Sequence, residues 1–219
     1  MELDRKNLRS ALTLTEVLVI VAVLAVLAVI LVPAGSRGRA RALRTQCISQ
    51  LIIIGQGEQQ SLMGHTNVVP FYPTGVSTNY GGTQEYISNG EVFRHFQVLS
   101  NEIFTPKILV CPSDVRKPAK SFETLSNSNI SYFIGLDASE ILLATFLAGD
   151  RNLTNDTLSS NGILEVTSES TAGWTREIHW LQGDVLLSDG SVQSLSNIKL
   201  GEALAGTGVA TNRLAMPLD

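Results

Sequence analysis

An uninterrupted apolar run near the N-terminus constrains this chain more than any other feature. From Leu12 to Val32 the run contains one ionisable side chain, Glu16, and Pro33 follows it directly. A helix over this stretch would be about 31 Å long, close to the thickness of the hydrocarbon core of a bilayer. We therefore predict a membrane-inserting helix over residues 12–33. A carboxylate is costly in such a segment, so Glu16 indicates a function and requires a partner.

The residues before Glu16 suggest what that partner is. A short basic leader, residues 1–11, ends in the small residue Ala11, and Leu12 follows it. The pattern resembles the N-terminal segment of type IV pilins and type II secretion pseudopilins, which usually carry Gly before the cut and Phe after it. The resemblance implies that prepilin peptidase cleaves between Ala11 and Leu12 and that the new amine of Leu12 is methylated. It also implies that Glu16 pairs with that amine on a neighbouring subunit, and that Pro33 occupies the kink position.

The same resemblance implies a fold and a function. The fold is α+β and pilin-like, with a long N-terminal helix whose first half spans the membrane and whose second half packs on a C-terminal antiparallel β-sheet domain. The function is that of a structural subunit of a type IV pilus-like or type II secretion pseudopilus filament, without enzymatic activity. The implied partners are other pilin subunits, prepilin peptidase, the inner-membrane assembly machinery and membrane lipid. The implied location is the inner membrane, with the C-terminal domain in the periplasm, and then a cell-surface or periplasmic filament.

Two alternatives stay open at this point. One is a membrane-tethered binding module that never polymerises. The other is a secreted binding module, because Val32-Pro33-Ala34 resembles a signal-peptidase site, although the apolar run is longer than an ordinary signal-peptide core and carries Glu16.

Basic residues lie on both sides of the run, and their count slightly favours a membrane orientation opposite to that of pilins. The net charge of −4 offers no basic field for nucleic acid.

Beyond the apolar run, periodicity predicts that the helix continues through residues 34–63. Four apolar positions recur at helical spacing and form one stripe: Leu43, Cys47, Leu51 and Ile54. Such a stripe is typical of a helix that packs on its own domain. Arg44 and the other arginines after the run are expected mostly on other faces. Residues 64–219 have the length of one ordinary domain, which we expect to be extracytoplasmic.

Apolar clusters and turn signals predict the elements of that domain. A short helix is expected over Val92–Leu99, and strands are expected over Lys107–Val110, Ile130–Ile134, Ile141–Leu147 and Gly162–Val166. The end of the chain reads as a meander with strands at Glu177–Leu181, Asp184–Ser188 and Ser191–Leu195, joined by turns at Gln182-Gly183 and Asp189-Gly190. Asp-Gly is among the strongest hairpin signals in a sequence.

His179 precedes Asp189 and Gly190 at a spacing that resembles the His-x9-Asp-Gly motif of many pilin-like proteins from Planctomycetes and Verrucomicrobia. The simplest interpretation is a histidine that is hydrogen-bonded within the sheet and an acid in a turn. Some pseudopilins bind calcium in loops of this sheet, and Asp150, Asp184 and Asp189 offer the hard oxygen ligands that Ca²⁺ prefers. Because no recognised calcium loop is present, we expect no cofactor and leave calcium open.

The two cysteines, Cys47 and Cys111, lie outside the predicted membrane segment. A disulfide is chemically permitted there if the domain is exported. It would close a loop of about sixty residues and contribute about 4 kcal/mol in the chain-entropy model. Two free thiols are the alternative. Cys111 opens the stretch Cys111-Pro112-Ser113-Asp114, which is similar to a motif in the same pilin-like proteins.

Overall fold

A computed structural model describes residues 13–64, 72–155 and 158–218, without the side chains of residues 30–37 and 62–64. The predicted cleavage site at Ala11 and Leu12 lies outside these residues. The chain divides into two compact units, Met1–Ala42 and Leu43–Asp219.

Helix α1 extends from Leu14 to Gly64. The prediction that the helix continues through residues 34–63 is therefore confirmed. The backbone of Pro33 belongs to α1, and its side chain is outside the described part of the chain. No helix among the described residues is both long and apolar enough to cross a membrane.

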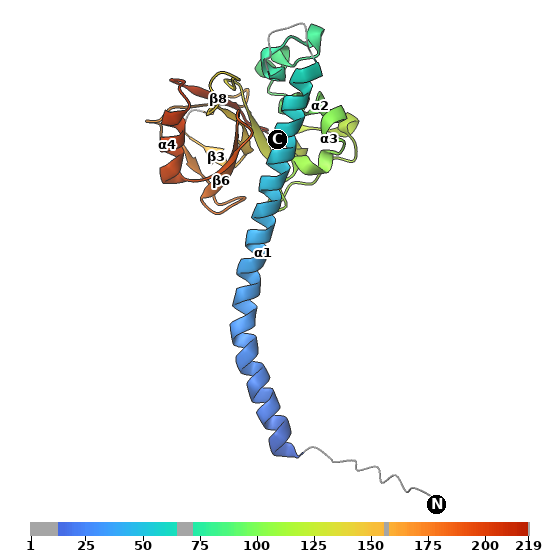
Figure 1. Ribbon diagram of the computed structural model, residues 1–219, viewed down its shortest axis with the longest axis vertical. Coiled ribbons are helices and arrows are strands. Elements are labelled where there is room, and N and C mark those ends of the chain that lie inside the picture. The colour runs from blue at the N-terminus through green and yellow to red at the C-terminus, as the bar shows by residue number, and fades with distance from the viewer. Residues whose placement is uncertain (1–12, 65–71, 156–157, 219) are drawn as a thin grey trace, which may run out of the picture. The chain divides into compact units, whose positions relative to one another are not determined.

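The second unit combines a β-sheet with short helices (Figure 1). The strands are β1 Tyr132–Gly135, β2 Phe146–Asp150, β3 Leu153–Thr154, β4 Ile163–Val166, β5 Gly173–Trp174, β6 Gln182–Leu187, β7 Val192–Ser196 and β8 Asn212–Ala215. The further α-helices are α2 Val92–Gln97, α3 Ser100–Ile103 and α4 Asn197–Gly206. Short 3-10 helices occupy Pro73–Gly75, Thr78–Tyr80, Gln84–Asn89, Pro106–Leu109, Phe122–Thr124 and Asn127–Asn129.

Six of the strands form one sheet in the order β4-β8-β1-β2-β6-β7. Every pair of neighbours in it is antiparallel. Strands β3 and β5 form a separate antiparallel pair. The α+β class and the antiparallel sheet are thus as predicted.

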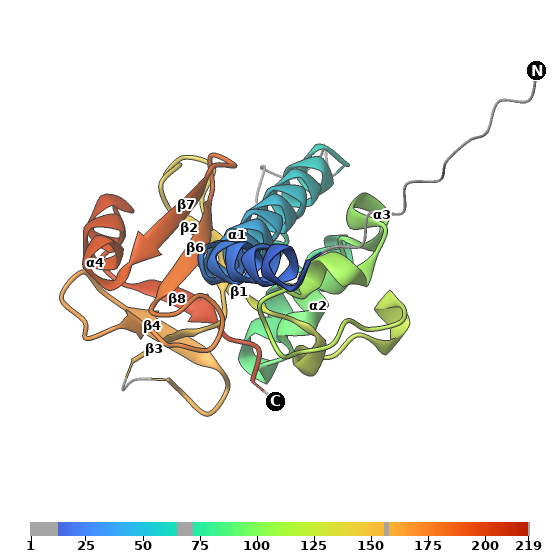
Figure 2. The same ribbon diagram turned by 90° about the horizontal axis from the view of Figure 1, so that it is seen from below.

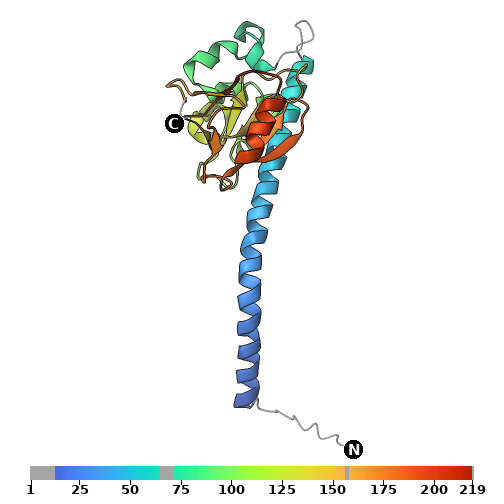
Figure 3. The ribbon, with the colours of Figure 1, turned by 90° about the vertical axis from the view of Figure 1, so that its left-hand side faces the viewer.

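Side-chain alternation along the strands divides the interior into two cores. Tyr132 and Ile134 of β1 enter one core, whereas Phe133 between them enters the other. This is the period of two that a strand imposes on its side chains. Helix α4 covers the second core, where Leu200 and Leu204 are buried. Figure 3, viewed from that side, shows α4 in front of the sheet.

The C-terminal part of α1 covers the other face of the sheet. Cys47, Leu51 and Ile54 of the predicted apolar stripe are each 0% exposed. Figures 1 and 2 show this part of α1 between the sheet and the short helices α2 and α3. A Cβ at Gly55 would lie 3.0 Å from Leu186 of β6, and one at Gly57 would lie 2.7 Å from Ile103 of α3. These glycines therefore allow the helix to approach both neighbours closely.

Several predicted elements are confirmed and others are wrong. Helix α2, strand β4 and the hairpin turn at Asp189-Gly190 lie where the sequence indicated. The predicted strand at Lys107–Val110 is a 3-10 turn, because Pro106 occupies its first position and the Thr105 side chain caps it. The predicted strand at Ile141–Leu147 begins only at Phe146, and Ile141 is 89% exposed.

The first strand of the predicted meander is also absent. Residues 177–179 form a turn, and Gln182-Gly183, which were predicted to be a turn, belong to β6. Trp180 and Leu181 have φ values of 52° and 61°. Such left-handed backbone interrupts an extended strand and reverses the chain direction before β6.

Candidate functional site

Glu16 closes the first turn of α1 through a reciprocal pair of hydrogen bonds with Thr13. The Thr13 backbone N–H donates to Glu16 Oε2 at 2.7 Å, and the Glu16 backbone N–H donates to Thr13 Oγ1 at 3.3 Å. The Thr13 hydroxyl also donates to Glu16 Oε2 at 2.8 Å. This is a capping box, which satisfies two of the backbone donors that a helix start leaves without partners. Sequence reasoning missed it, although the Thr-x-x-Glu spacing signals it.

The helix surface that follows Glu16 is apolar on all sides and exposed. Leu14 is 83% exposed, Val21 is 59% exposed and Val29 is 75% exposed. A helix that is hydrophobic all round is typically covered by other protein or by lipid. The described segment Leu14–Val29 therefore exposes a continuous apolar surface, with the carboxylate of Glu16 near its start.

In the second unit, two buried carboxylates face each other across neighbouring strands. The register of β2 and β6 pairs Gly149 with Val185, which places Asp150 beside Asp184. The Asp184 backbone N–H donates to Asp150 Oδ2 at 2.7 Å. Both side chains are 0% exposed, and Asp150 Oδ1 has no hydrogen-bond partner among the described residues. Burial and the nearby Asp184 charge raise the pKa of Asp150 well above its usual range.

His179 reaches both carboxylates from the turn before β6. Its Nε2 lies 3.5 Å from Asp150 Oδ2 and 3.7 Å from Asp184 Oδ2, and its side chain is 4% exposed. Burial lowers the pKa of His179, although the Asp184 carboxylate acts in the opposite direction. The left-handed backbone of Trp180 and Leu181 leads the chain from this turn into β6. The histidine of the predicted family motif is thus part of the buried interior.

Arg44 of α1 contacts the same cluster from the helix side. Its Nη2 donates to Asp184 Oδ1 at 3.0 Å, and its Nε lies 3.2 Å and 3.3 Å from the two carboxylate oxygens. Arg44 Nη1 donates to the Gln182 side chain, and the Ser194 hydroxyl donates to Asp184 Oδ1. The expectation that Arg44 lies on another face is wrong, because Arg44 is one helical turn from Cys47 and shares its face.

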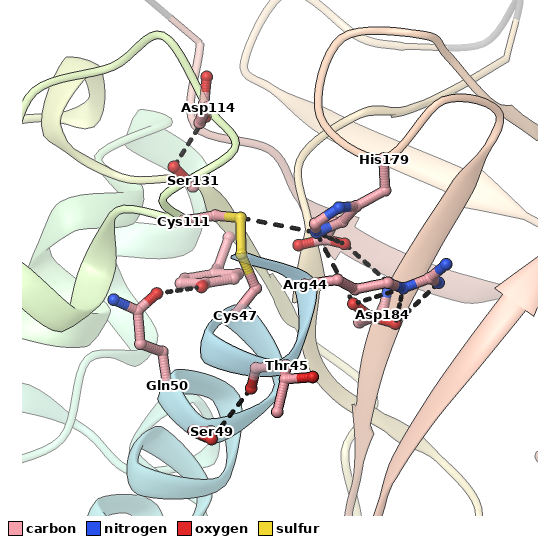
Figure 4. Close-up of a disulfide and its surroundings, with 12 residues drawn as sticks. Arg44, Thr45, Cys47, Ser49, Gln50, Cys111, Asp114, Ser131, His179 and Asp184 are labelled. Carbon is pink, nitrogen blue, oxygen red and sulfur yellow. Dashed lines mark hydrogen bonds and ion pairs between the residues drawn. A yellow bond between two sulfur atoms is a disulfide. The ribbon is translucent and has the colours of Figure 1, made fainter. Parts of the chain in front are cut away.

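Cys47 and Cys111 form a disulfide beside this cluster (Figure 4). Their Cα atoms are 5.1 Å apart, and both residues are 0% exposed. Cys111 Sγ lies 3.5 Å from His179 Nε2. Of the two alternatives left open by the sequence, the structure has the disulfide. We call Arg44, Asp150, His179, Asp184 and the disulfide the helix–sheet junction.

The rest of the Cys-Pro-Ser-Asp stretch fixes the end of β2. Asp114 accepts hydrogen bonds from Nε and Nη2 of Arg151, both at 2.8 Å, and from the Ser131 hydroxyl at 2.7 Å. Burial acts to raise the pKa of Asp114, but these donors outweigh it and hold the pKa below its usual value. Arg151 directly follows Asp150, so Asp114 holds the residue next to the helix–sheet junction, of which Cys111 is itself a part.

The three carboxylates proposed as calcium ligands do not come together. Asp150 and Asp184 are neighbours, but Asp189 lies in the exposed turn beyond the other end of β6, where it accepts from the Ser191 N–H. Asp184 and Asp189 are five positions apart along mostly extended chain, or roughly 15 Å. The side chain that groups with Asp150 and Asp184 is that of His179, not that of Asp189.

A further buried acid lies on α1 at Glu58. It is 3% exposed, and its Oε2 has no hydrogen-bond partner in the part of the chain that the structure describes. Burial, with a contribution from the charge of Glu102, raises its pKa from 4.5 to about 8. No sequence pattern marks Glu58 as buried, apart from its place one helical turn after Ile54.

Comparison of the chain with protein-family models found no match. Comparisons with curated proteins and with solved structures also found none.

Proposed function

We propose that this chain is a pilin-like structural subunit of a type IV pilus-like or type II secretion pseudopilus filament. The observation that carries the proposal is the exposed, all-round apolar surface of Leu14–Val29, with Glu16 as its single charged residue. Association of such helices removes this surface from water at about 25 cal/mol per Å². In a filament the covering partners would be the same segments of neighbouring subunits. Before assembly, inner-membrane lipid would cover them.

Glu16 has a defined task in this proposal. Prepilin peptidase cuts before Leu12 and creates an α-ammonium, which Glu16 of a neighbouring subunit then binds. A pair of this kind, buried among apolar helices, offsets its desolvation only when the two charges meet closely. It would therefore favour one axial register between subunits. The capping box places the Glu16 carboxylate at the start of α1, next to the position where the new amine would lie.

The helix–sheet junction suits a subunit that must carry load. In the second unit, the disulfide joins α1 covalently to Cys111, and Arg44 joins it electrostatically to β6. Tension applied to α1 would then reach the sheet through a covalent bond as well as through packing. The domain would stay folded on its helix when the filament is pulled.

The first experiment is an intact mass and N-terminal sequence of the protein extracted from native membranes. A chain that starts at Leu12, with or without one methyl group, is the expected result. A chain that starts at Met1 or Glu2 would contradict the proposal and favour a tethered binding module. A start at Gly35 would contradict it in favour of a secreted domain.

Three substitutions separate the charge of Glu16 from its capping role. Glu16→Gln keeps a side chain that can cap the helix but removes the charge, and we expect at least about a tenfold loss of assembled filament. Glu16→Ala removes both roles and should assemble no better. Thr13→Ala weakens the cap but keeps the charge, so it should assemble nearly normally. Normal filaments from Glu16→Gln would show that Glu16 acts only as a cap.

A further inference from the structure

We propose that Asp150, His179 and Asp184 form a binding site for a divalent first-row transition metal, with Zn²⁺ as the ion that fits best. The proposal goes beyond a filament function and does not depend on it. One potential ligand atom from each residue, a carboxylate oxygen of Asp150 and of Asp184 and a ring nitrogen of His179, lies within 4.8 Å of the other two.

The distances within the cluster fit metal ligands better than hydrogen bonds. His179 Nε2 lies 3.5 Å and 3.7 Å from the two carboxylate oxygens. A direct N–H···O bond would measure about 2.7–3.2 Å. Ligand atoms placed tetrahedrally around Zn²⁺ at 2.0–2.2 Å lie roughly 3.3–3.6 Å from one another. One ion between the three groups would therefore need only small side-chain shifts.

A second observation concerns the other carboxylate oxygen of Asp150, which is buried and unsatisfied. Asp150 is 0% exposed, and its Oδ1 has no hydrogen-bond partner among the described residues. Buried polar atoms without a partner are rare and costly, and an absent ion is one common explanation. Arg44 already pairs with Asp184, and a divalent ion would supply the further positive charge that the facing carboxylate of Asp150 needs.

The surroundings of the ligands resemble those of a structural metal site. Asp184 is oriented by Arg44 and by the Ser194 hydroxyl, and Asp150 by the Asp184 N–H. Hydrogen bonds of this kind hold ligating carboxylates in place. Arg44 keeps its own charge partly in solvent, with 24% of its side chain exposed.

The chemical types of the three ligands favour some metal ions over others. An imidazole and two carboxylates suit Zn²⁺ and its first-row neighbours, whereas Ca²⁺ takes six to eight oxygen ligands. The nearest sulfur, Cys111 Sγ, is part of the disulfide and supplies no thiolate. The ion would join the ends of β2 and β6 to the turn that carries His179.

The test measures metal in the full chain, purified in detergent with its disulfide intact and with free thiols shown to be absent. The protein is stripped with a chelator, incubated with Zn²⁺ alone, passed over a desalting column and analysed for bound metal. We expect one equivalent per chain and an increase in Tm of roughly 5–10 °C when free Zn²⁺ is about 100 times Kd. Co²⁺ in place of Zn²⁺ should give the intense visible bands of a four-coordinate ion.

Matched variants locate the site. Asp150→Asn keeps an oxygen that can accept a hydrogen bond from the Asp184 N–H, so this variant should fold. Asp150→Asn and His179→Gln, tested as separate single variants, should each lose the bound metal. His95→Gln and Asp189→Asn alter a buried histidine and a turn acid elsewhere in the domain, and both should bind as the wild type does. Less than about one tenth of an equivalent in the wild type, with no change in Tm, would overturn the proposal. Equal metal binding by Asp150→Asn and the wild type would also overturn it.

Discussion

Arg44 of α1 and Asp184 of β6 form an ion pair in which the carboxylate is 0% exposed and the guanidinium is 24% exposed. Removing one partner from such a pair leaves a buried charge uncompensated. We expect Arg44→Met, which keeps most of the apolar stem, to lower the free energy of unfolding by about 2–4 kcal/mol. Urea unfolding of the full chain in detergent, followed by tryptophan fluorescence, measures this loss.

A double-mutant cycle assigns that loss to the pair. Arg44→Met combined with Asp184→Asn should cost less than the sum of the two single changes, by about 1–3 kcal/mol. Lys199→Ala removes an exposed cation and should change stability by less than about 0.5 kcal/mol. Strictly additive losses would mean that Arg44 contributes through packing alone.

Asp114 and Arg151 form a second pair, with side chains that are 1% and 16% exposed. Asp114→Asn should destabilise the chain by about 2–3 kcal/mol near pH 7, because it leaves Arg151 without its bidentate partner. The folded-state pKa of Asp114 is lowered, so its stabilisation is present above the unfolded pKa and is lost as pH falls below it. The stabilities of variant and wild type should therefore converge in acid, as thermal unfolding at a series of pH values would measure.

The pair of Asp137 and Arg213 is the control for this prediction. Its side chains are 18% and 51% exposed, so solvent screens it more strongly. Asp137→Asn should cost about 1 kcal/mol or less. Equal losses for Asp114→Asn and Asp137→Asn would contradict the role given to burial.

Local signals predicted the parts of the fold that depend on few residues. Asp189-Gly190 makes its hairpin because Gly190 adopts a φ of 84°, which glycine tolerates. The apolar stripe through Cys47 and Leu51 is buried because helical spacing places its members on one face. Such patterns need no knowledge of distant parts of the chain.

The helix–sheet junction could not be predicted in the same way. Arg44 and Asp184 are 140 positions apart, and only the packing of α1 on β6 brings them together. The strand expected at Glu177–Leu181 failed because two non-glycine residues, Trp180 and Leu181, adopt left-handed backbone that no local propensity favours. His179 therefore enters the cluster from a turn, and Asp189 is left at the other end of β6.

The disulfide between Cys47 and Cys111 closes a loop with a sequence separation of 64. Loss of this constraint should reduce the free energy of unfolding by about 4 kcal/mol in the chain-entropy model. Chemical unfolding with and without a thiol reductant measures the difference. The double variant Cys47→Ala, Cys111→Ala should be less stable than the oxidised wild type and should not respond to reductant. A reductant effect that persists in this variant would contradict the assignment.

Glu58 provides a prediction of opposite sign to that for Asp114. Its pKa rises to about 8 in the folded chain, so the folded state holds a proton that the unfolded state releases, and stability falls as pH increases from 4.5 to 8. Glu58→Gln removes the charge, and it should be more stable than the wild type by about 3–5 kcal/mol at pH 8 but by less than about 1 kcal/mol at pH 4.5. Urea unfolding at the two pH values measures this difference.

The control for Glu58→Gln is Glu85→Gln. Hydrogen bonds from Ser77 and Thr78 lower the pKa of Glu85 to about 2 in the folded chain. Glu85→Gln should therefore lose stability near neutral pH. A gain for Glu58→Gln that is equal at both pH values would indicate improved packing instead of relief from a buried charge.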